Sequence, residues 1–404
     1  MPAKSQARPQ QEKLNDRSRM RRRSEPVMFA VLHPAFALTG VLHAIGGALL
    51  PSVASAFQLT DAQSGSLFFS YFLGTSVGAL FCVGHYVRLM TAGFLVVAAT
   101  CFGIAFAGNT FLQPLFFALG IGVGIPMTAV SMFAGRRFVD CSAAPLTVLN
   151  FSWSAGAFLA PLLAARVLVH HTYRTAYEAL GVAAAVAAVA CWFGLQDTPR
   201  IAIMEDSTAR SLQLRWVAFF AILTFLEVGI ENTTATWLAT YVLRNSGTGA
   251  ASAAASSSLY WCGFLASRGL SSLLLLRVAP MRVLRAAVIT AFAAAALLVA
   301  FSATPARDSA MLVLGAALAP IFPLLLARFF AGAHNASDSR WMLATCGFGG
   351  SVLPWLTGWV SARSGSLRVG LITVPAALLL MLSMLPLVAK WRESNIHHAS
   401  STTS

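Results

Sequence analysis

Two glutamates lie four residues apart inside an otherwise apolar run of the chain. The run extends from about residue 216 to 242 and contains Glu227, Glu231 and Asn232. A charged side chain at the centre of a lipid bilayer costs about 2.5–3.5 kcal/mol on insertion scales, so such residues usually face a cavity or a partner. At a spacing of four residues, both glutamates share one face of a helix. The pair indicates a site that binds and releases a proton or another cation.

A structural ion pair is the alternative interpretation of these glutamates. Arg268 lies in an apolar segment at an expected depth similar to that of Glu227, and Arg328 is a second candidate charge partner. His43 could act as a proton relay, because a histidine side chain titrates near neutral pH. A single histidine on an apolar helix is, however, more often simply hydrogen-bonded.

Amide and aromatic side chains in the apolar segments are candidates for binding a solute. An amide can hydrogen-bond a hydroxylated ligand, and an aromatic face can stack on a sugar ring. Embedded amides also join helices to one another, and Trp and Tyr gather at membrane interfaces, so packing roles are the alternative. The candidate substrate-binding residues are Tyr71, Asn150, Trp153, Asn232, Trp237, Tyr260 and Trp261.

The composition places these residues in an integral membrane protein. Of the 404 residues, 57% are hydrophobic and 10% are charged, whereas soluble domains have about 25% charged residues. The net charge of +14 does not indicate a nucleic-acid surface, because eight of the 28 basic residues precede Ser24 and most others separate apolar segments. The six cysteines are scattered without metal-ligand spacing, so we expect no disulfide, metal or cofactor.

Twelve segments are long and apolar enough to cross a bilayer, which takes about 20 residues. Lipid offers the backbone no hydrogen bonds, so the segments must be helices, since a barrel would show short alternating strands. We therefore expect an all-α polytopic membrane protein. The segments are 29–52, 64–86, 89–108, 110–134, 144–168, 174–195, 214–242, 250–276, 282–303, 309–331, 341–362 and 367–389.

The positions of the basic residues predict the orientation and the division of the chain. With the N-terminus inside, 22 of the 28 Lys and Arg residues fall on the inner side, which obeys the positive-inside rule with both termini cytoplasmic. The expected units are a disordered basic cytoplasmic tail (1–28), an N-terminal six-helix bundle (29–195), a cytoplasmic linker (196–213), a C-terminal six-helix bundle (214–389) and a cytoplasmic tail (390–404).

Matching residues at offsets of 189 to 197 indicate that the second half repeats the first. Duplication of a six-helix unit into parallel halves is the arrangement of major facilitator transporters. The matches are Tyr71 and Gly74 with Tyr260 and Gly263, Gly156 and Pro161 with Gly349 and Pro354, and Pro126 with Pro323.

The sequence also resembles major facilitator transporters directly over residues 30–389. Within them it resembles the branch of fucose, galactose and glucose:proton symporters and their uncharacterised bacterial relatives. This resemblance implies a twelve-helix fold, alternating access, a small-molecule substrate and proton coupling, in a monomer of the bacterial inner membrane. The motifs are GGALLPSVASAF (46–57), LTDAQSGSLFFSYFLG (59–74), NFSWSAGAFLAPLL (150–163), FLEVGIENTTATWLATY (225–241) and APIFPLLLA (319–327).

The chain departs from that branch at its acidic residues. The sugar symporters of the branch carry acidic residues in the first and fourth helices, but here those helices hold none, and the fourth reads GIGVGIPMTAV (120–130). Proton coupling would therefore have to use other residues, with Glu227 and Glu231 as the candidates.

The run GAFLAPLLAA (156–165) is similar to the glycine-rich signature of proton-coupled drug antiporters. Export of an apolar compound is therefore the alternative to uptake of a sugar or related polar metabolite. A non-transporting sensor or scaffold is a further reading. Protease, hydrolase and ATP-binding motifs do not occur in the sequence, so we expect no enzyme.

Overall fold

The computed structural model describes residues 7–137, 144–196, 214–301, 304–330 and 336–401. Within these ranges the secondary structure is helical, without a β-strand. The helices are α1 (Ala7–Phe57), α2 (Asp61–Leu80), α3 (Tyr86–Phe106), α4 (Asn109–Arg137), α5 (Ala144–Leu168), α6 (Tyr173–Gly194), α7 (Leu214–Ser246), α8 (Ala250–Leu274), α9 (Pro280–Ala300), α10 (Thr304–Leu318), α11 (Ile321–Phe330), α12 (Ala336–Ser364), α13 (Leu367–Gly370) and α14 (Thr373–Ser401).

These helices make twelve spans, because two spans are each built from two helices. Among the described residues, nine segments are long and apolar enough to cross a membrane, and α10 with α11 forms one of them. The break between α10 and α11 falls at Pro320, since proline has no backbone N–H to continue a helix. The short α13 and the start of α14 form the last span. The spans rich in Gly and Ser, namely α2, α8 and α12, complete the set.

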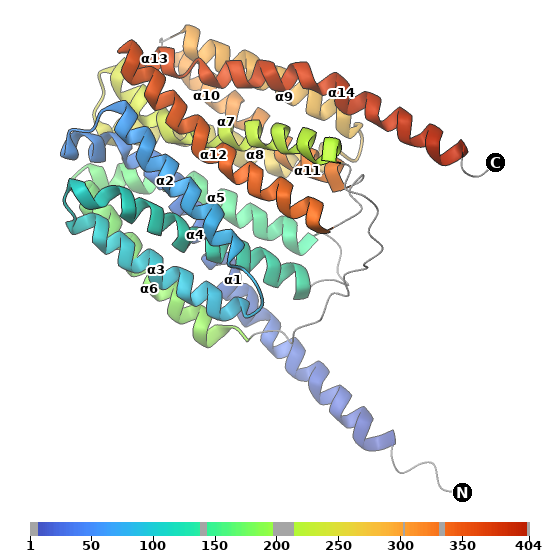
Figure 1. The fold of residues 1–404 in the computed structure, drawn as a ribbon. Helices are drawn as coiled ribbons and strands as arrows, with labels where there is room; N and C mark the ends of the chain where they lie inside the picture. Colours follow the sequence, from blue (N-terminus) through green and yellow to red (C-terminus); the bar gives the residue numbers. More distant parts are fainter. Residues whose placement is uncertain (1–6, 138–143, 197–213, 302–303, 331–335, 402–404) are drawn as a thin grey trace, which may run out of the picture.

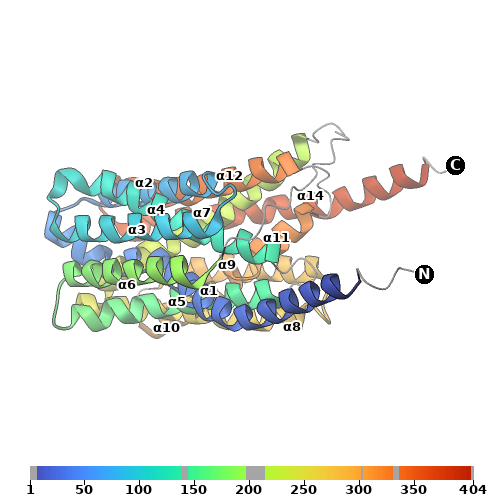
Figure 2. The ribbon, with the colours of Figure 1, turned by 90° about the horizontal axis from the view of Figure 1, so that it is seen from below.

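The spans form two bundles, one below the other in Figure 1, so that one lies in front of the other in Figure 2, which views the molecule from below. Helices α1–α6 make the first bundle and α7–α14 the second, and both chain termini leave the molecule at the same end. Between the bundles, α2 packs on α12, α5 on α8 and α1 on α7. The all-α, twelve-span fold with two repeated six-helix bundles that the sequence predicts is therefore confirmed.

The repeat in the sequence recurs as matched contacts between helices. A methyl group on Gly120 of α4 would overlap the backbone of Tyr71 in α2, and one on Gly315 of α10 would overlap the backbone of Tyr260 in α8. Small residues at such points let helix backbones approach closely in a membrane. A second matched pair is Gly156 against Ala37, which joins α5 to α1, and Gly349 against Phe225, which joins α12 to α7.

The expected N-terminal tail (1–28) overlaps the first helix. Residues 1–6 lie outside the described residues, but α1 begins at Ala7 and runs without a break into the first span. Gln, Glu, Lys and Arg, which are abundant in this segment, are good helix formers, and extending an existing helix avoids the cost of nucleation. The expected linker falls almost entirely on 197–213, outside the described residues.

The contact between α8 and α10 yields a stability prediction. Replacing Gly263 by Ala places a methyl group against the carbonyl oxygen of Leu312, whereas Gly269, in the same helix, has open space around it. Overpacking of this kind costs about 1–3 kcal/mol. We expect Gly263→Ala to lower the melting temperature of the detergent-purified protein and Gly269→Ala to leave it unchanged or slightly raised. Equal melting temperatures for the two variants would contradict the packing described here.

Candidate functional site

The two glutamates lie on α7, where this helix packs against α8. Glu227 is fully buried, with 0% of its surface exposed, and neither of its carboxylate oxygens has a hydrogen-bond partner among the described residues. Both Glu227 and Glu231 lie within electrostatic reach of Arg268 on α8. A buried charge without a hydrogen bond is costly, so this arrangement favours an uncharged carboxyl or a bound ligand at Glu227.

The guanidinium of Arg268 faces the first bundle. Its Nη1 donates to Oγ of Ser154 on α5 at 3.4 Å, and its central carbon lies 5.6 Å from the ring centre of Trp153. Within α8 it also lies 4.8 Å from the ring centre of Phe264. Its Nε is buried and has no partner among the described residues. Arg268 therefore links the second bundle to the first.

A cluster of rings joins the two bundles beside this arginine. His43 of α1 has its Nε2 3.1 Å from Oδ1 of Asn232 on α7, an oxygen that accepts a hydrogen bond. The His43 ring centre lies 5.2 Å from that of Trp153 and 6.4 Å from that of Trp261. The two indoles are 6.0 Å apart, and Tyr260 lies 5.1 Å from Trp261. Residues from α1, α5, α7 and α8 thus form one site between the halves.

Four of the candidate residues lie outside this cluster. The hydroxyl of Tyr71 donates to the carbonyl of Leu42 at 3.2 Å within the first bundle, and Nε1 of Trp237 donates to the carbonyl of Pro354 at 3.0 Å within the second. Both polar groups therefore serve helix packing. The other two are Asn150, which is exposed on α5, and Arg328, which lies 6.0 Å from the ring centre of Trp216.

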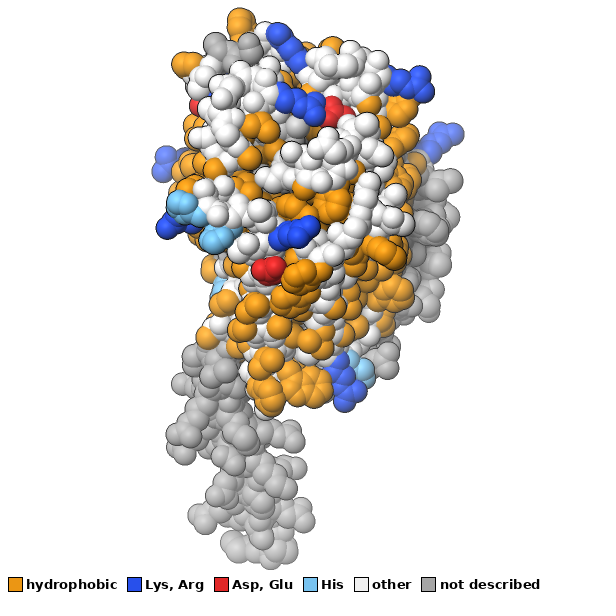
Figure 3. All heavy atoms as spheres, turned by 90° about the vertical axis from the view of Figure 1, so that its left-hand side faces the viewer, with side chains coloured by type: hydrophobic (Ala, Val, Ile, Leu, Met, Phe, Trp, Pro, Cys, Tyr) orange, Lys and Arg blue, Asp and Glu red, His pale blue; other side chains and the backbone are white. Residues whose placement is uncertain are grey.

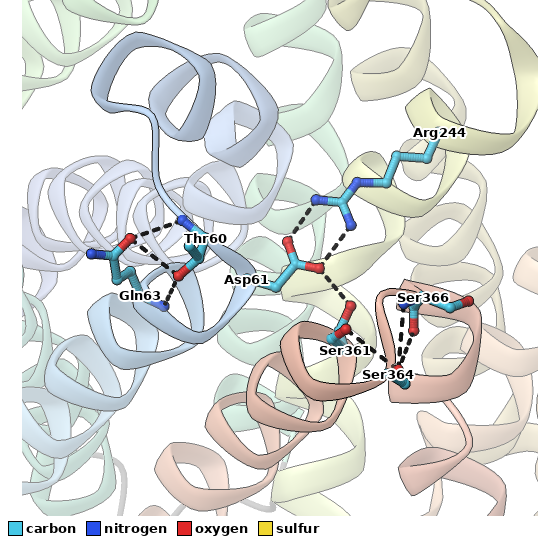
Figure 4. Close-up of polar contacts among 7 residues, drawn as sticks. All are labelled: Thr60, Asp61, Gln63, Arg244, Ser361, Ser364 and Ser366. Atoms are coloured by element: carbon cyan, nitrogen blue, oxygen red, sulfur yellow. Dashed lines mark hydrogen bonds and ion pairs between the residues drawn. The ribbon is translucent and has the colours of Figure 1, made fainter.

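A second polar contact between the halves lies at the end opposite the termini, and sequence reasoning missed it. The guanidinium of Arg244 holds both carboxylate oxygens of Asp61, at 2.7 and 2.6 Å (Figure 4). The hydroxyl of Ser361 donates to the same carboxylate at 2.5 Å. We call these three residues the clasp. It ties α2 of the first half to α7 and α12 of the second.

The start of α2 fixes the position of the clasp. Thr60 caps this helix, and Gln63 completes the capping box, a pattern that satisfies two backbone N–H groups at a helix start. Asp61 is the first residue of α2 and is thereby held in place. The capping pattern is visible in the sequence. The pairing of Asp61 with Arg244, 183 residues further along the chain, is not. Figure 3 views this end of the molecule, where a few basic and acidic side chains (blue and red) lie among hydrophobic and other ones (orange and white).

The fold and this site define a class of protein. Two repeated, parallel six-helix bundles are the arrangement of major facilitator transporters. A model of the Major Facilitator Superfamily matches residues 32–337, and the chain belongs to this superfamily.

Relatives of the chain include sugar transporters. The glucose/mannose transporter GlcP of Bacillus subtilis (strain 168) is 24% identical over 377 residues, which cover 86% of this chain and 92% of GlcP. The crystal structure of a bacterial homologue of the human lysosomal transporter Spinster, inward-facing and occupied, has a TM-score of 0.72 at 12% identity, covering 91% of this chain and 97% of its own. The transporter FucP, in the outward conformation, has a TM-score of 0.60 at 19% identity, and the match covers 90% of this chain and 99% of FucP. These structures show the fold.

The clasp yields a prediction of energetic coupling. Asp61→Asn and Arg244→Gln each remove one side of the same ion pair, so the double variant should lose little more stability than either single variant. We expect a coupling free energy of about 1 kcal/mol, the upper end for surface pairs, because Asp61 is only 12% exposed while Arg244 is 45% exposed. Thermal unfolding of the four proteins measures it.

Arg363 provides the control for this cycle, because it stacks on Trp359 rather than joining the clasp. Arg363→Gln combined with Asp61→Asn should give additive losses. Additive losses for Asp61→Asn with Arg244→Gln would instead contradict the ion pair.

Proposed function

We propose that this protein takes up a hexose, or a similar polyhydroxylated solute, by symport with protons. The solute would bind at the site between the halves, which rock around it to open one end at a time. We place it in the bacterial inner membrane as a monomer, with both termini cytoplasmic. The excess of Lys and Arg on the predicted inner side and the shared end of the two termini support this orientation.

The observation that carries the proposal is a set of buried polar atoms without partners. Among the described residues, these atoms belong to four helices that meet at one site, and they include both hydrogen-bond donors and acceptors. The set comprises Nδ1 of His43, Nε1 of Trp153, the hydroxyl of Tyr260, both carboxylate oxygens of Glu227 and Nε of Arg268.

A polyhydroxylated ligand matches this set. Each hydroxyl can donate and accept, so one sugar could satisfy several of these atoms at once. Each unsatisfied buried group costs about 1–3 kcal/mol, and ligand binding would relieve that cost. The indoles of Trp153 and Trp261 lie 6.0 Å apart at this site, and an indole is a ring of the kind that can pack against the carbon side of a sugar. The names of GlcP, a glucose/mannose transporter, and FucP, a fucose:proton symporter, agree with this substrate class.

The charge of the site supports proton coupling. Two carboxyls face one guanidinium, so the site carries one net negative charge when both acids are ionised and none when one of them is protonated. A neutral site crosses between the two open states more easily than a charged one, since moving charge into a low-dielectric interior is unfavourable. Binding a proton on one side and releasing it on the other would thus drive the solute.

Export of an apolar compound is the second candidate. The run 156–165, which resembles the antiporter signature, lies on α5, the helix that brings Trp153 and Ser154 to the site. An aromatic site would also accept a lipophilic compound. A thermal-shift screen against hexoses and polyols, and against lipophilic cations and antibiotics, separates the two functions, because a ligand that binds the folded state raises its melting temperature. Stabilisation only by lipophilic compounds would make export the better proposal.

The unpartnered hydroxyl of Tyr260 yields a binding prediction. Tyr260→Phe removes a group that has no partner within the described residues, so the ligand-free protein should keep its stability. The melting-temperature rise on adding D-glucose, or the hexose that gives the largest shift, should shrink by at least half, an estimate based on losing one hydrogen bond of about 1 kcal/mol.

Tyr71→Phe is the matched control, because its hydroxyl bonds Leu42 outside the cluster. It should lower the stability of the ligand-free protein and leave the hexose shift intact. The reverse pattern in the two variants would place the solute elsewhere.

The two acids yield a coupling prediction. With Glu227 and Glu231 both replaced by Gln, the site can no longer bind a coupling proton, so accumulation of the hexose against its gradient should be abolished. Counterflow exchange, which needs no net proton movement, should survive. Proteoliposomes with an imposed pH gradient measure both activities, and Glu178→Gln on α6, away from the site, serves as control. Concentrative uptake by the double variant would refute coupling through these residues.

A further inference from the structure

We infer that Arg268 is the positioning residue that transmits the charge of Glu227 to the contact between the two halves. It would pair with the acids of α7 when they are ionised and turn to α5 when they are neutral. This inference rests on the proposed proton coupling and adds the element that links proton binding to closure of the halves.

Arg268 lies between two sets of partners. On one side it lies within reach of Glu227 and Glu231, which belong to its own half. On the other side it holds Ser154 and Trp153, which belong to the first half. The same guanidinium therefore has a partner set in each bundle, and it cannot serve both fully at once.

The structure shows one of these two arrangements. Arg268 donates to Ser154 at 3.4 Å, which is long for a hydrogen bond, while both carboxylate oxygens of Glu227 are without a partner. An ionised carboxylate prefers the two-pronged guanidinium fork over most other partners, and its attraction is strong in a low dielectric. The observed contacts are those expected when Glu227 is protonated, because Arg268 bonds Ser154 and both oxygens of Glu227 are without a partner.

Few other charges surround the guanidinium of Arg268 among the described residues. Besides the two glutamates of α7, Tyr260 of α8 and His43 of α1 are the titratable groups at the site. From α5, Ser154 and Trp153 present only uncharged groups. On the other side of α8, the charged residues of α10 are Arg307 and Asp308, which pair with each other near the start of that helix. The ionisation of the acids is therefore the main control on where Arg268 points.

Movement of Arg268 would change the contact between the two halves. Helices α5 and α8 pack together across it, and Arg268 supplies a polar link between them. When a glutamate releases its proton, Arg268 would turn back to α7 and this link would be lost. Proton release and separation of α5 from α8 would then occur together, which is the coupling that a symporter requires.

The functional test compares two variants of Arg268 in proteoliposomes. Arg268→Gln removes the cation, so the acids should stay protonated across the tested pH range. Counterflow of D-glucose, or of the hexose with the largest thermal shift, should then lose its pH dependence, and accumulation driven by a pH gradient should fall at least about tenfold. Arg268→Lys keeps the charge without the planar fork and should retain the pH dependence with reduced accumulation.

Arg328→Gln is the matched control, because it removes an arginine that lies over Trp216 outside the cluster. It should keep the wild-type shape of the pH profile even if less protein folds. A merely structural role for Arg268 would likewise lower the amount of folded protein and leave the pH profile unchanged. A wild-type pH profile for Arg268→Gln would therefore overturn the inference.

A stability measurement separates this inference from the proposed function. At pH 8, Arg268→Gln should lower the melting temperature more in the wild-type background than in Glu227→Gln, because only an ionised Glu227 needs the cation. Equal effects in the two backgrounds would overturn the role of Arg268, whatever the substrate. Unequal effects without any hexose transport would instead keep the Arg268–Glu227 link and reject the hexose proposal.

Discussion

The cost of holding charge inside a membrane governs the arrangement around α7. Glu227 is fully buried, so it needs a proton, a cation or a ligand to be tolerated there. The only arginine that the described residues bring to this site, Arg268, reaches both the acids and the opposite half. Because two sets of partners compete for Arg268, the site can adopt two arrangements of the same side chains. Two such conformations are what a conformational switch requires.

Close packing of helices makes this competition possible. Glycines at matched points of both halves let α1 meet α5 and α7 meet α12 without intervening side chains. The polar residues of α1, α5, α7 and α8 are thereby brought to one place between the bundles. The clasp acts at a distance from them, where Asp61, Arg244 and Ser361 join the halves at the end opposite the termini. The halves are thus joined at two places, at the polar cluster of α1, α5, α7 and α8 and at the clasp.

Much of the fold could be predicted from the sequence, and less of the site. Span length and charge asymmetry predict twelve helices, because the bilayer imposes both. The repeat assigns Tyr71 and Tyr260 to matching positions, yet only Tyr260 joins the cluster, since the carbonyl of Leu42 takes the Tyr71 hydroxyl. The pairing of Asp61 with Arg244 depends on how two halves dock, which local sequence patterns do not encode.

The most direct measurement of the central claim is proton movement caused by the solute alone. Proteoliposomes that contain a pH-sensitive dye would receive D-glucose, or the hexose with the largest thermal shift, with no imposed gradient. Proton symport predicts that the interior becomes acidic as the hexose enters, and that liposomes carrying the protein with both Glu227 and Glu231 replaced by Gln show no such change. Entry of the labelled hexose at a constant internal pH would contradict it.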